Sequence, residues 1–327
     1  MSAAVAILGL KTALPGPARP LADDPELGDE AGPLYADTPA RTLSGQLDLR
    51  PEAMPRWPRL DRYGRALAHV CLAATPAPLS ESSPPPGMLV TSQRSCHETN
   101  AAFDQGLIEK GPRLASPLLF PYTLPGAAAA EVAMVLKLGG PYLVWCGGPA
   151  TALLSVVTAA DLIEAGAASR LLVAAADVLG GHSLRDLDRP VTPAPLPWAE
   201  AAAALWLAPA DDPALGPRRR LTAGVGPAGA TAAEIATLCT ETLAAAELEP
   251  ALLAEIVTTS TDVEACAALE AALGALAPTV PLLQLPWRVG DAGAALGLLA
   301  VAAALEGTCP CLLLALDRQG SVALVLE

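Results

Sequence analysis

The order of hydrophobic and polar positions divides the chain into short apolar runs and longer segments with helical spacing. The short runs are rich in Val, Leu and Ile, which is typical of buried β-strands; they cover residues 5–8, 88–91, 142–146, 171–175, 221–225, 255–258, 312–316 and 322–326. The longer runs are rich in Ala and predict helices over 126–137, 150–165, 231–245, 262–276 and 291–305. This alternation predicts an α/β protein whose sheets are buried beneath helices.

Proline-rich segments interrupt this pattern in two places. Residues 14–58 contain many prolines, several acids and little periodicity, which predicts an extended surface excursion. A second irregular region surrounds residue 215. We therefore expect an N-terminal half over 1–215 and a C-terminal half over 216–327, and pseudo-duplicated halves are one interpretation.

One uncharged stretch, residues 138–160, is long enough to suggest a membrane span. Gly139-Gly140-Pro141 and Gly147-Gly148-Pro149 divide it, so a buried strand followed by a buried helix is the better interpretation. The N-terminal apolar run has no basic residues before it and predicts a strand, not a secretion signal. We expect a soluble, cytoplasmic protein with no membrane partner.

Composition and charge exclude several classes of protein and of binding partner. The 52% apolar content is too high for a disordered chain, and the formal net charge of −14 argues against a nucleic-acid partner. The seven cysteines are odd in number and form no C-x-x-C pair, which favours thiols buried in a reducing cytosol over disulfides or metal ligands. No dinucleotide or phosphate-loop fingerprint is present. We expect neither a metal nor a cofactor.

A family resemblance begins with F-P-Y-T-L-P-G-A-A-A-A-E-V-A at residues 120–133, followed by L-G-G-P at 138–141. This sequence resembles the segment before the nucleophile of the β-ketoacyl synthases, the condensing enzymes of the thiolase fold. Residues 5–9, 59–63 and 165–177 resemble three further motifs of that family, in order. The resemblance implies a thiolase-like five-layer αβαβα sandwich of two pseudo-repeated halves.

The same resemblance locates four degenerate catalytic positions. Pro149 stands where the family has its cysteine, at a strand-to-helix elbow. Ser260 is the residue nearest to the position of the family's first catalytic histidine. Pro286 replaces the lysine and Asp291 the second histidine. Proline has no thiol, although its fixed φ suits the first turn of a helix, and an acid at 291 would repel a malonyl carboxylate. The resemblance therefore implies no catalytic residue.

Degenerate synthases of this kind resemble the chain length factors of type II polyketide synthases. The usual residue at the elbow of chain length factors is Gln, so Pro149 departs from the best-known aromatic-polyketide group. The shorter chain and truncated loops are more similar to those of the small partners in polyene or aryl-polyene systems. The implied function is a catalytically inactive subunit that pairs with an active ketosynthase as a heterodimer. It would shape the acyl tunnel for polyketide or polyene elongation on an acyl carrier protein and have no activity alone.

Interface and tunnel residues follow from the same resemblance. Strand 142–146 would pair across the dimer axis, which makes Leu143, Val144 and Trp145 interface residues; an ordinary internal strand is the alternative. Asn100, Phe103 and Leu107 share one face of the helical segment 98–109 and would line the tunnel, unless they simply pack in the core.

Two other functions remain open from the sequence. One is an independent acyltransferase that uses a relocated cysteine, either Cys96, which adjoins His97, or Cys146, although we expect Cys146 to be a buried small hydrophobe on its strand. The other is a homodimeric, non-catalytic scaffold. Arginines at 56, 59, 62 and 65 or at 218–220 would contact an acidic carrier protein or form internal salt bridges.

Overall fold

The computed structural model describes residues 2–17, 19–20, 39–44, 47, 54–76, 84–180, 196–211, 218–317 and 320–327. The strands of the first half are β1 (Ser2–Ala13), β4 (Gly87–Ser92), β5 (Tyr142–Cys146), β6 (Leu171–Asp177) and β8 (Ala201–Pro209). Those of the second half are β9 (Arg218–Gly226), β10 (Glu255–Thr258), β11 (Leu282–Gln284), β12 (Cys311–Leu316) and β13 (Ser321–Leu326). The helices are α2 (Arg62–Ala74), α3 (His97–Lys110), α4 (Gly126–Leu136), α5 (Pro149–Glu164), α7 (Ala232–Ala245), α8 (Val263–Leu276), α9 (Leu285–Val289) and α10 (Ala295–Glu306).

The two halves repeat one strand order. The ten strands form a continuous sheet in the order β11-β10-β12-β13-β9-β1-β8-β6-β4-β5. In each half, the outermost strand is third in the chain, followed inward by the second, fourth, fifth and first. β1 joins the halves by antiparallel pairing with β9, from Ser2↔Thr222 to Ala6↔Arg218. The expected division at residue 215 lies outside the described residues, between β8 and β9, and stays a prediction.

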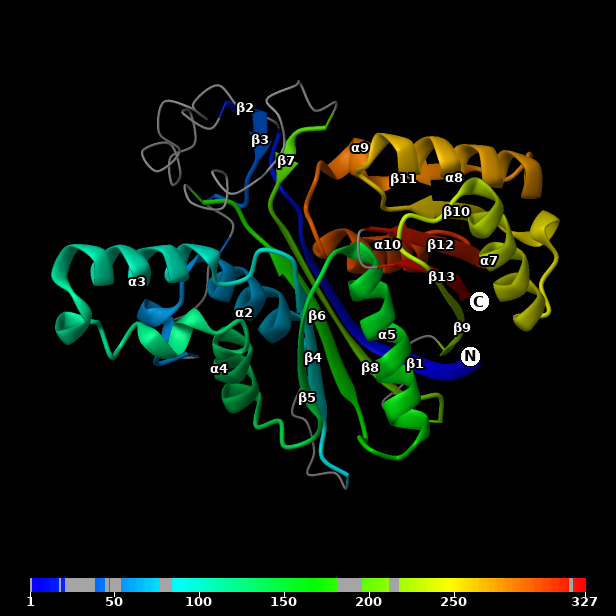
Figure 1. Cartoon of the computed structure of the whole chain (residues 1–327). Helices are drawn as coiled ribbons and strands as arrows, with labels where there is room; N and C mark the ends of the chain where they lie inside the picture. The colour runs from blue at the N-terminus through cyan, green and yellow to red at the C-terminus, as the bar shows by residue number, and fades with distance from the viewer. Residues whose placement is uncertain are drawn as a thin grey trace.

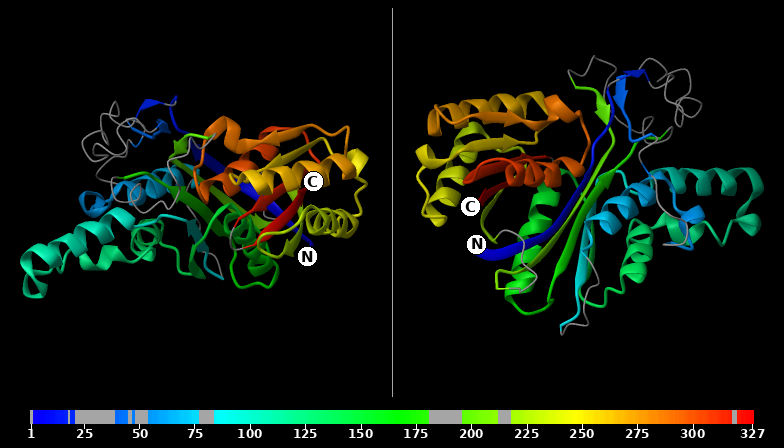
Figure 2. Two further views of the ribbon diagram at one scale, coloured as in Figure 1. Left: turned by 45° about the horizontal axis from the view of Figure 1, so that its top comes forward. Right: turned by 180° about the vertical axis from the view of Figure 1, so that it is seen from behind.

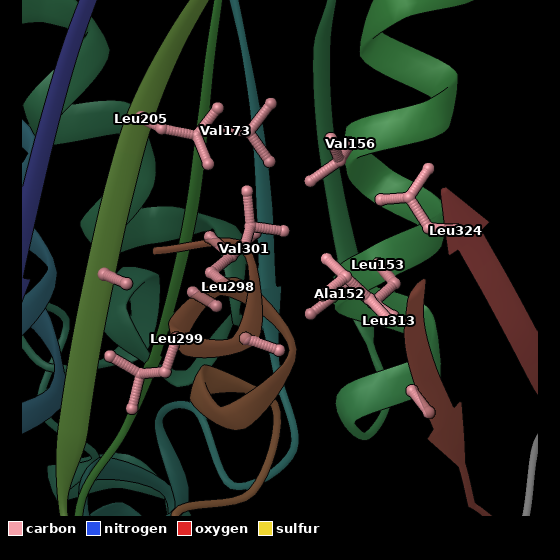
Figure 3. Close-up of a cluster of buried hydrophobic side chains, with 14 of the residues drawn as sticks. Ala152, Leu153, Val156, Val173, Leu205, Leu298, Leu299, Val301, Leu313 and Leu324 are labelled. Atoms are coloured by element: carbon pink, nitrogen blue, oxygen red, sulfur yellow. The ribbon is translucent and has the colours of Figure 1, made fainter. Parts of the chain in front are cut away.

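Helices separate and cover the two halves of the sheet in five layers (Figures 1 and 2). α5 and α10 pack against each other and contact strands of both halves, whereas α2 and α4 cover the outer face of the first half and α7 and α8 that of the second. Each of the three helical layers packs on the sheet through its own hydrophobic cluster. Figure 3 shows the central one, where Leu153 and Val156 of α5 lie between strands of opposite halves. This arrangement confirms the expected five-layer fold.

The apolar stretch 138–160 forms strand β5 and then the first part of α5, as predicted. Residues Gly147 and Gly148 separate the two elements. Within the described residues, no helix is both long and apolar enough to cross a membrane.

Two elements differ from the sequence-based expectation. The segment A-A-A-A-L-W-L-A-P over Ala201–Pro209 is strand β8, buried in the middle of the first half, although its alanines have no strand-like pattern. Part of the excursion 14–58 is also ordered into strands. β2 (Arg19–Pro20) and β3 (Pro39–Arg41) form a small sheet with β7 (Trp198–Ala199).

Candidate functional site

Pro149 is the first residue of α5, directly after the turn that leaves edge strand β5. Its side chain is buried, and Gly148 is the N-cap. Proline is well suited to this position because its missing N–H would have no intrahelical partner and its φ is already helical. The elbow therefore keeps its geometry while it offers neither a thiol nor a backbone donor at residue 149.

Asp317, directly after β12, caps this helix. Its Oδ2 accepts a hydrogen bond of 3.0 Å from Ala150 N. A β-carbon at residue 148 would lie only 2.6 Å from the same Oδ2, so the carboxylate packs directly on the Gly148 backbone. The sequence analysis gave no sign of this contact.

Ser260 and Pro286 lie at one end of the second half-sheet. Ser260 follows β10, and Pro286 follows the parallel neighbouring strand β11 within α9. Both residues are buried. Ser260 Oγ has no hydrogen-bond partner among the described residues. A lone hydroxyl and a proline supply no imidazole or ammonium group there.

Asp291 follows α9 and is buried against Arg94, which comes from the loop after β4. Arg94 Nη2 lies 3.8 Å from Asp291 Oδ1 and donates to the Asp291 carbonyl oxygen at 3.3 Å. The Arg94 guanidinium also lies 5.3 Å from the centre of the Trp198 ring. The position thus holds a paired carboxylate, not a free imidazole.

A second aspartate, Asp177 at the end of β6, holds the start of α10. Its fully buried carboxylate accepts hydrogen bonds from Ala294 N at 2.7 Å, Arg94 N at 2.7 Å, Ser92 Oγ at 3.0 Å and Gln93 N at 3.0 Å. Burial raises the pKa of Asp177, although Arg94 and the backbone donors oppose the rise. This residue links β4, β6 and α10 at one point.

The starts of α5 and α10 lie side by side in the central layer. A β-carbon at Gly297, in the first turn of α10, would collide with Pro149 O. The structure thus brings the Pro149 and Asp291 regions to the same end of the molecule. In the described part of the chain, no cluster of three or more His, Cys, Asp or Glu side chains is placed to hold a metal ion.

Strand β5 is the last strand of the sheet and pairs in parallel with β4. No other strand in the described ranges covers its free edge. Leu143 and Trp145 pack toward the central cluster and Val144 toward the outer one, and all three stay half-exposed. In the single chain, β5 is therefore an edge strand of the sheet and not an internal one.

The expected tunnel residues Asn100, Phe103 and Leu107 lie on α3, which projects from the sheet in Figure 1. All three are half-buried, and Thr99 is the single fully buried side chain of this helix. The Phe103 ring packs against Phe120, with 5.7 Å between ring centres. Neither Phe103 nor Leu107 belongs to one of the three hydrophobic clusters.

Large apolar side chains are exposed on the elements that precede β5. α3, the short helices η4 (Pro112–Leu114) and η5 (Phe120–Thr123) and α4 pack against one another. Their exposed hydrophobic residues, with one from β5, are Ile108, Leu114, Leu118, Phe120, Leu124, Met134 and Tyr142. We call these seven residues the apolar surface. Tyr142 connects β5 to this group, since its hydroxyl donates to Gly126 O at the start of α4. Large exposed apolar side chains are candidates for an interaction site.

The two candidate cysteines differ in exposure. Cys96 is buried, and its thiol donates to Thr123 O at 3.1 Å. Burial raises the pKa of this thiol, which disfavours the reactive thiolate. Cys146, at the end of β5, is exposed. The expectation that Cys146 is buried was wrong, because β5 is the edge strand and no described strand pairs with it on that side.

The basic residues near α2 are engaged within the chain. Arg56 pairs with Glu131 at 3.0 Å and Arg62 with the buried Glu200 at 2.6 Å. Arg65 donates to Leu60 O at 3.1 Å. These contacts favour the interpretation of internal salt bridges over a carrier-protein patch.

No protein family model matches the sequence, and no curated protein matches it. The structure is similar to that of the ishigamide ketosynthase/chain length factor, with a TM-score of 0.79 and 20% identity over 99% of this chain and 98% of that one. It is also similar to a β-ketoacyl synthase from Burkholderia phymatum STM815, with a TM-score of 0.81 and 16% identity over 100% and 99% of the two chains.

A third similar structure is AntDE:AntF, described as a type II PKS acyl-carrier protein in complex with its ketosynthase bound to the hexaketide. Its TM-score is 0.74, with 16% identity over the whole of both chains. The chain therefore has the thiolase-like fold of the ketosynthases and ketosynthase/chain length factors, as the sequence resemblance implied. At sequence identities of 16–20%, this structural similarity establishes the fold of the chain and not its activity.

Proposed function

We propose that this chain is a catalytically silent ketosynthase-like subunit, a chain length factor, that forms a heterodimer with an active β-ketoacyl synthase. The observation that carries the proposal is Pro149 at the start of α5. The elbow that would present a nucleophile is intact, but its residue has neither a sulfur nor an N–H. Ser260, Pro286 and Asp291 supply no replacement for the other catalytic groups.

The partner would supply the chemistry. Decarboxylative Claisen condensation on an acyl carrier protein needs a thiolate that carries the acyl chain and donors that stabilise an oxyanion. In the heterodimer these groups belong to the ketosynthase. This subunit would close the acyl tunnel with Asn100, Phe103 and Leu107 and so limit the length of a polyketide or polyene chain.

The open edge of β5 and the adjoining apolar surface support pairing with a like-folded partner. An uncovered edge presents unpaired N–H and C=O groups that another strand can bond. Ile108, Leu114 and Phe120 of the apolar surface are exposed in the single chain and would be buried in such a complex. A homodimer by the same edge is the scaffold alternative, and the experiment below separates the two.

The direction of the β5 amides makes a sharp test available. Met88 N donates to Pro141 O and Gly147 N donates to Ser92 O, so the odd-numbered residues of β5 bond to β4. Because strand amides alternate in direction, Val144 N–H faces the open edge. Val144→Pro should therefore remove an edge donor while it leaves the pairing with β4 in place.

The test is co-purification of the tagged chain with an active ketosynthase encoded beside it. We expect a stable heterodimer with the native chain and at least about a tenfold loss of complex with Val144→Pro, because proline blocks the added strand. Val144→Thr is the matched control, since it keeps the N–H and the β-branched shape and should pair normally.

Three outcomes would contradict the proposal. They are a stable homodimer without copurification of the ketosynthase, a Val144→Pro variant that pairs as well as the native chain, and robust condensation by the isolated chain. Labelling of Cys96 or Cys146 by an acyl-chloromethyl ketone probe at one group per chain would instead favour the acyltransferase alternative.

A further inference from the structure

The start of α5 has the features of an anion site. The first intrahelical hydrogen bond runs from Ala152 N to Gly148 O at 3.2 Å, so the earlier amides point out of the helix end. Unpaired amides and the helix dipole together stabilise a negative charge at such an end. A thiolate or an oxyanion at residue 149 would depend on this stabilisation.

This end is already occupied by a negative charge of the chain itself. Asp317 Oδ2 accepts from Ala150 N at 3.0 Å, and its Cγ would lie 3.2 Å from a β-carbon on Gly148. The carboxylate therefore contacts the residues on both sides of Pro149. A glycine at 148 is required because any larger side chain would meet the carboxylate.

The turn between β12 and β13 fixes this carboxylate in place. Asp317 Oδ1 accepts from Gly320 N at 3.2 Å, and Asp317 N donates to Gly320 O at 3.0 Å. Aspartate is favoured at the first position of such a turn because its side chain can bond the backbone ahead. One oxygen thus holds the turn and the other holds α5.

We infer that Asp317 is a second block to condensing chemistry, separate from Pro149, because its carboxylate fills the N-terminal anion site of α5. The inference rests on the proposed function only in taking residue 149 as the nucleophile position. A cysteine placed at 149 would share one helix turn with a fixed negative charge, and the Ala150 amide would already be engaged. Restoring the cysteine alone would therefore not restore an activated thiol.

The test compares Pro149→Cys with the double variant Pro149→Cys/Asp317→Asn. The asparagine has one oxygen acceptor, which can serve Ala150 N, so it removes the charge and gives up only the bond from Gly320 N. Both proteins are treated with iodoacetamide across pH 6–10, and labelling at position 149 is followed by peptide mass spectrometry, which separates this thiol from the seven native cysteines. We expect the double variant to react about tenfold faster at pH 7, as its thiolate loses a repulsive neighbour.

Equal alkylation rates, or a fast-reacting thiol in Pro149→Cys alone, would overturn the inference. If the cysteine variants do not fold, hydrogen exchange of the Ala150 amide in the otherwise native chain decides. We expect Asp317→Ala to speed that exchange at least about tenfold and Asp317→Asn to leave it nearly unchanged, since only the alanine lacks an acceptor. An unchanged rate in Asp317→Ala would overturn the inference. Failure of this test would leave copurification with a ketosynthase unaffected, so the two proposals fail separately.

Discussion

The two helices of the central layer begin in related ways but in different surroundings. Asp177, at the end of the fourth strand of the first half, binds the start of α10 in the second half. Asp317, after the fourth strand of the second half, binds the start of α5 in the first half. Each aspartate lies against a glycine, Gly293 or Gly148, that leaves no room for a β-carbon. The repeated topology thus includes an exchanged pair of helix caps.

The two caps differ in burial. Asp177 is fully buried and bonds Ser92, Gln93, Arg94 and Ala294, whereas Asp317 is half-buried, and its carboxylate binds the amides of Ala150 and Gly320. The cap of α10 therefore contributes mainly to stability. The cap of α5 lies at the strand-to-helix elbow beside Pro149, so under our proposal its main effect is on chemistry.

The largest expected effect separates the two carboxylates directly. Asp177→Ala should lower the free energy of unfolding by about 3–5 kcal/mol, because it leaves the Arg94 amide and three other donors without their acceptor. Asp317→Ala should cost about 1 kcal/mol, as for loss of a helix cap. Urea denaturation monitored by circular dichroism measures both, and similar losses in the two variants would refute the contrast.

The glycines beneath the carboxylates give the next test. Gly293 has a φ of +54° and lies against the buried Asp177, so Gly293→Ala should destabilise by about 2–3 kcal/mol through strain and collision. Gly148 has a φ of −88°, so an alanine there would meet the Asp317 carboxylate without added backbone strain. Gly148→Ala should cost about half as much. Thermal unfolding of the two alanine variants ranks them, and the reverse order would show that Asp317 is held as rigidly as Asp177.

The smallest expected effect is a change of folding stability with pH that arises from Asp177, the cap of α10. Because burial raises the pKa of Asp177, the folded chain binds this proton more tightly than the unfolded chain does. The stability that this carboxyl contributes is complete below the ordinary Asp pKa and is lost as the pH rises through the raised value. We expect the native chain to lose stability relative to Asp177→Asn from about pH 4 upward. Urea titrations at a series of pH values give the free energy of unfolding of both proteins. A constant difference between the native chain and Asp177→Asn at every pH would contradict this prediction.

Much of the fold could be predicted because the signals are local. The strands at Tyr142–Cys146 and Glu255–Thr258 match the expected bounds, since runs of β-branched and apolar residues between turn signals indicate buried strands. The alanine-rich β8 could not be found this way. Its small side chains are tolerated in a strand because β1 and β6 pair with both edges of β8. This tertiary context overrides the helical preference of alanine.

The candidate site was only partly predictable. Pro149 at the elbow followed from motif spacing, because the strand and the helix on either side are contiguous in sequence. The contact of Asp317 with Ala150 joins residues far apart in the chain and depends on how the two halves are packed. The Arg94–Asp291 pair was missed for the same reason.

The shared strand β1 also has a consequence for how the chain is made. β1 is synthesised before the other strands of the sheet, yet one of its edges finds its partner, β9, only after the whole first half has left the ribosome. Until then the nascent protein carries an open edge at each end of its partial sheet. Such edges invite aggregation, so a chaperone or early assembly would matter most during this interval of translation.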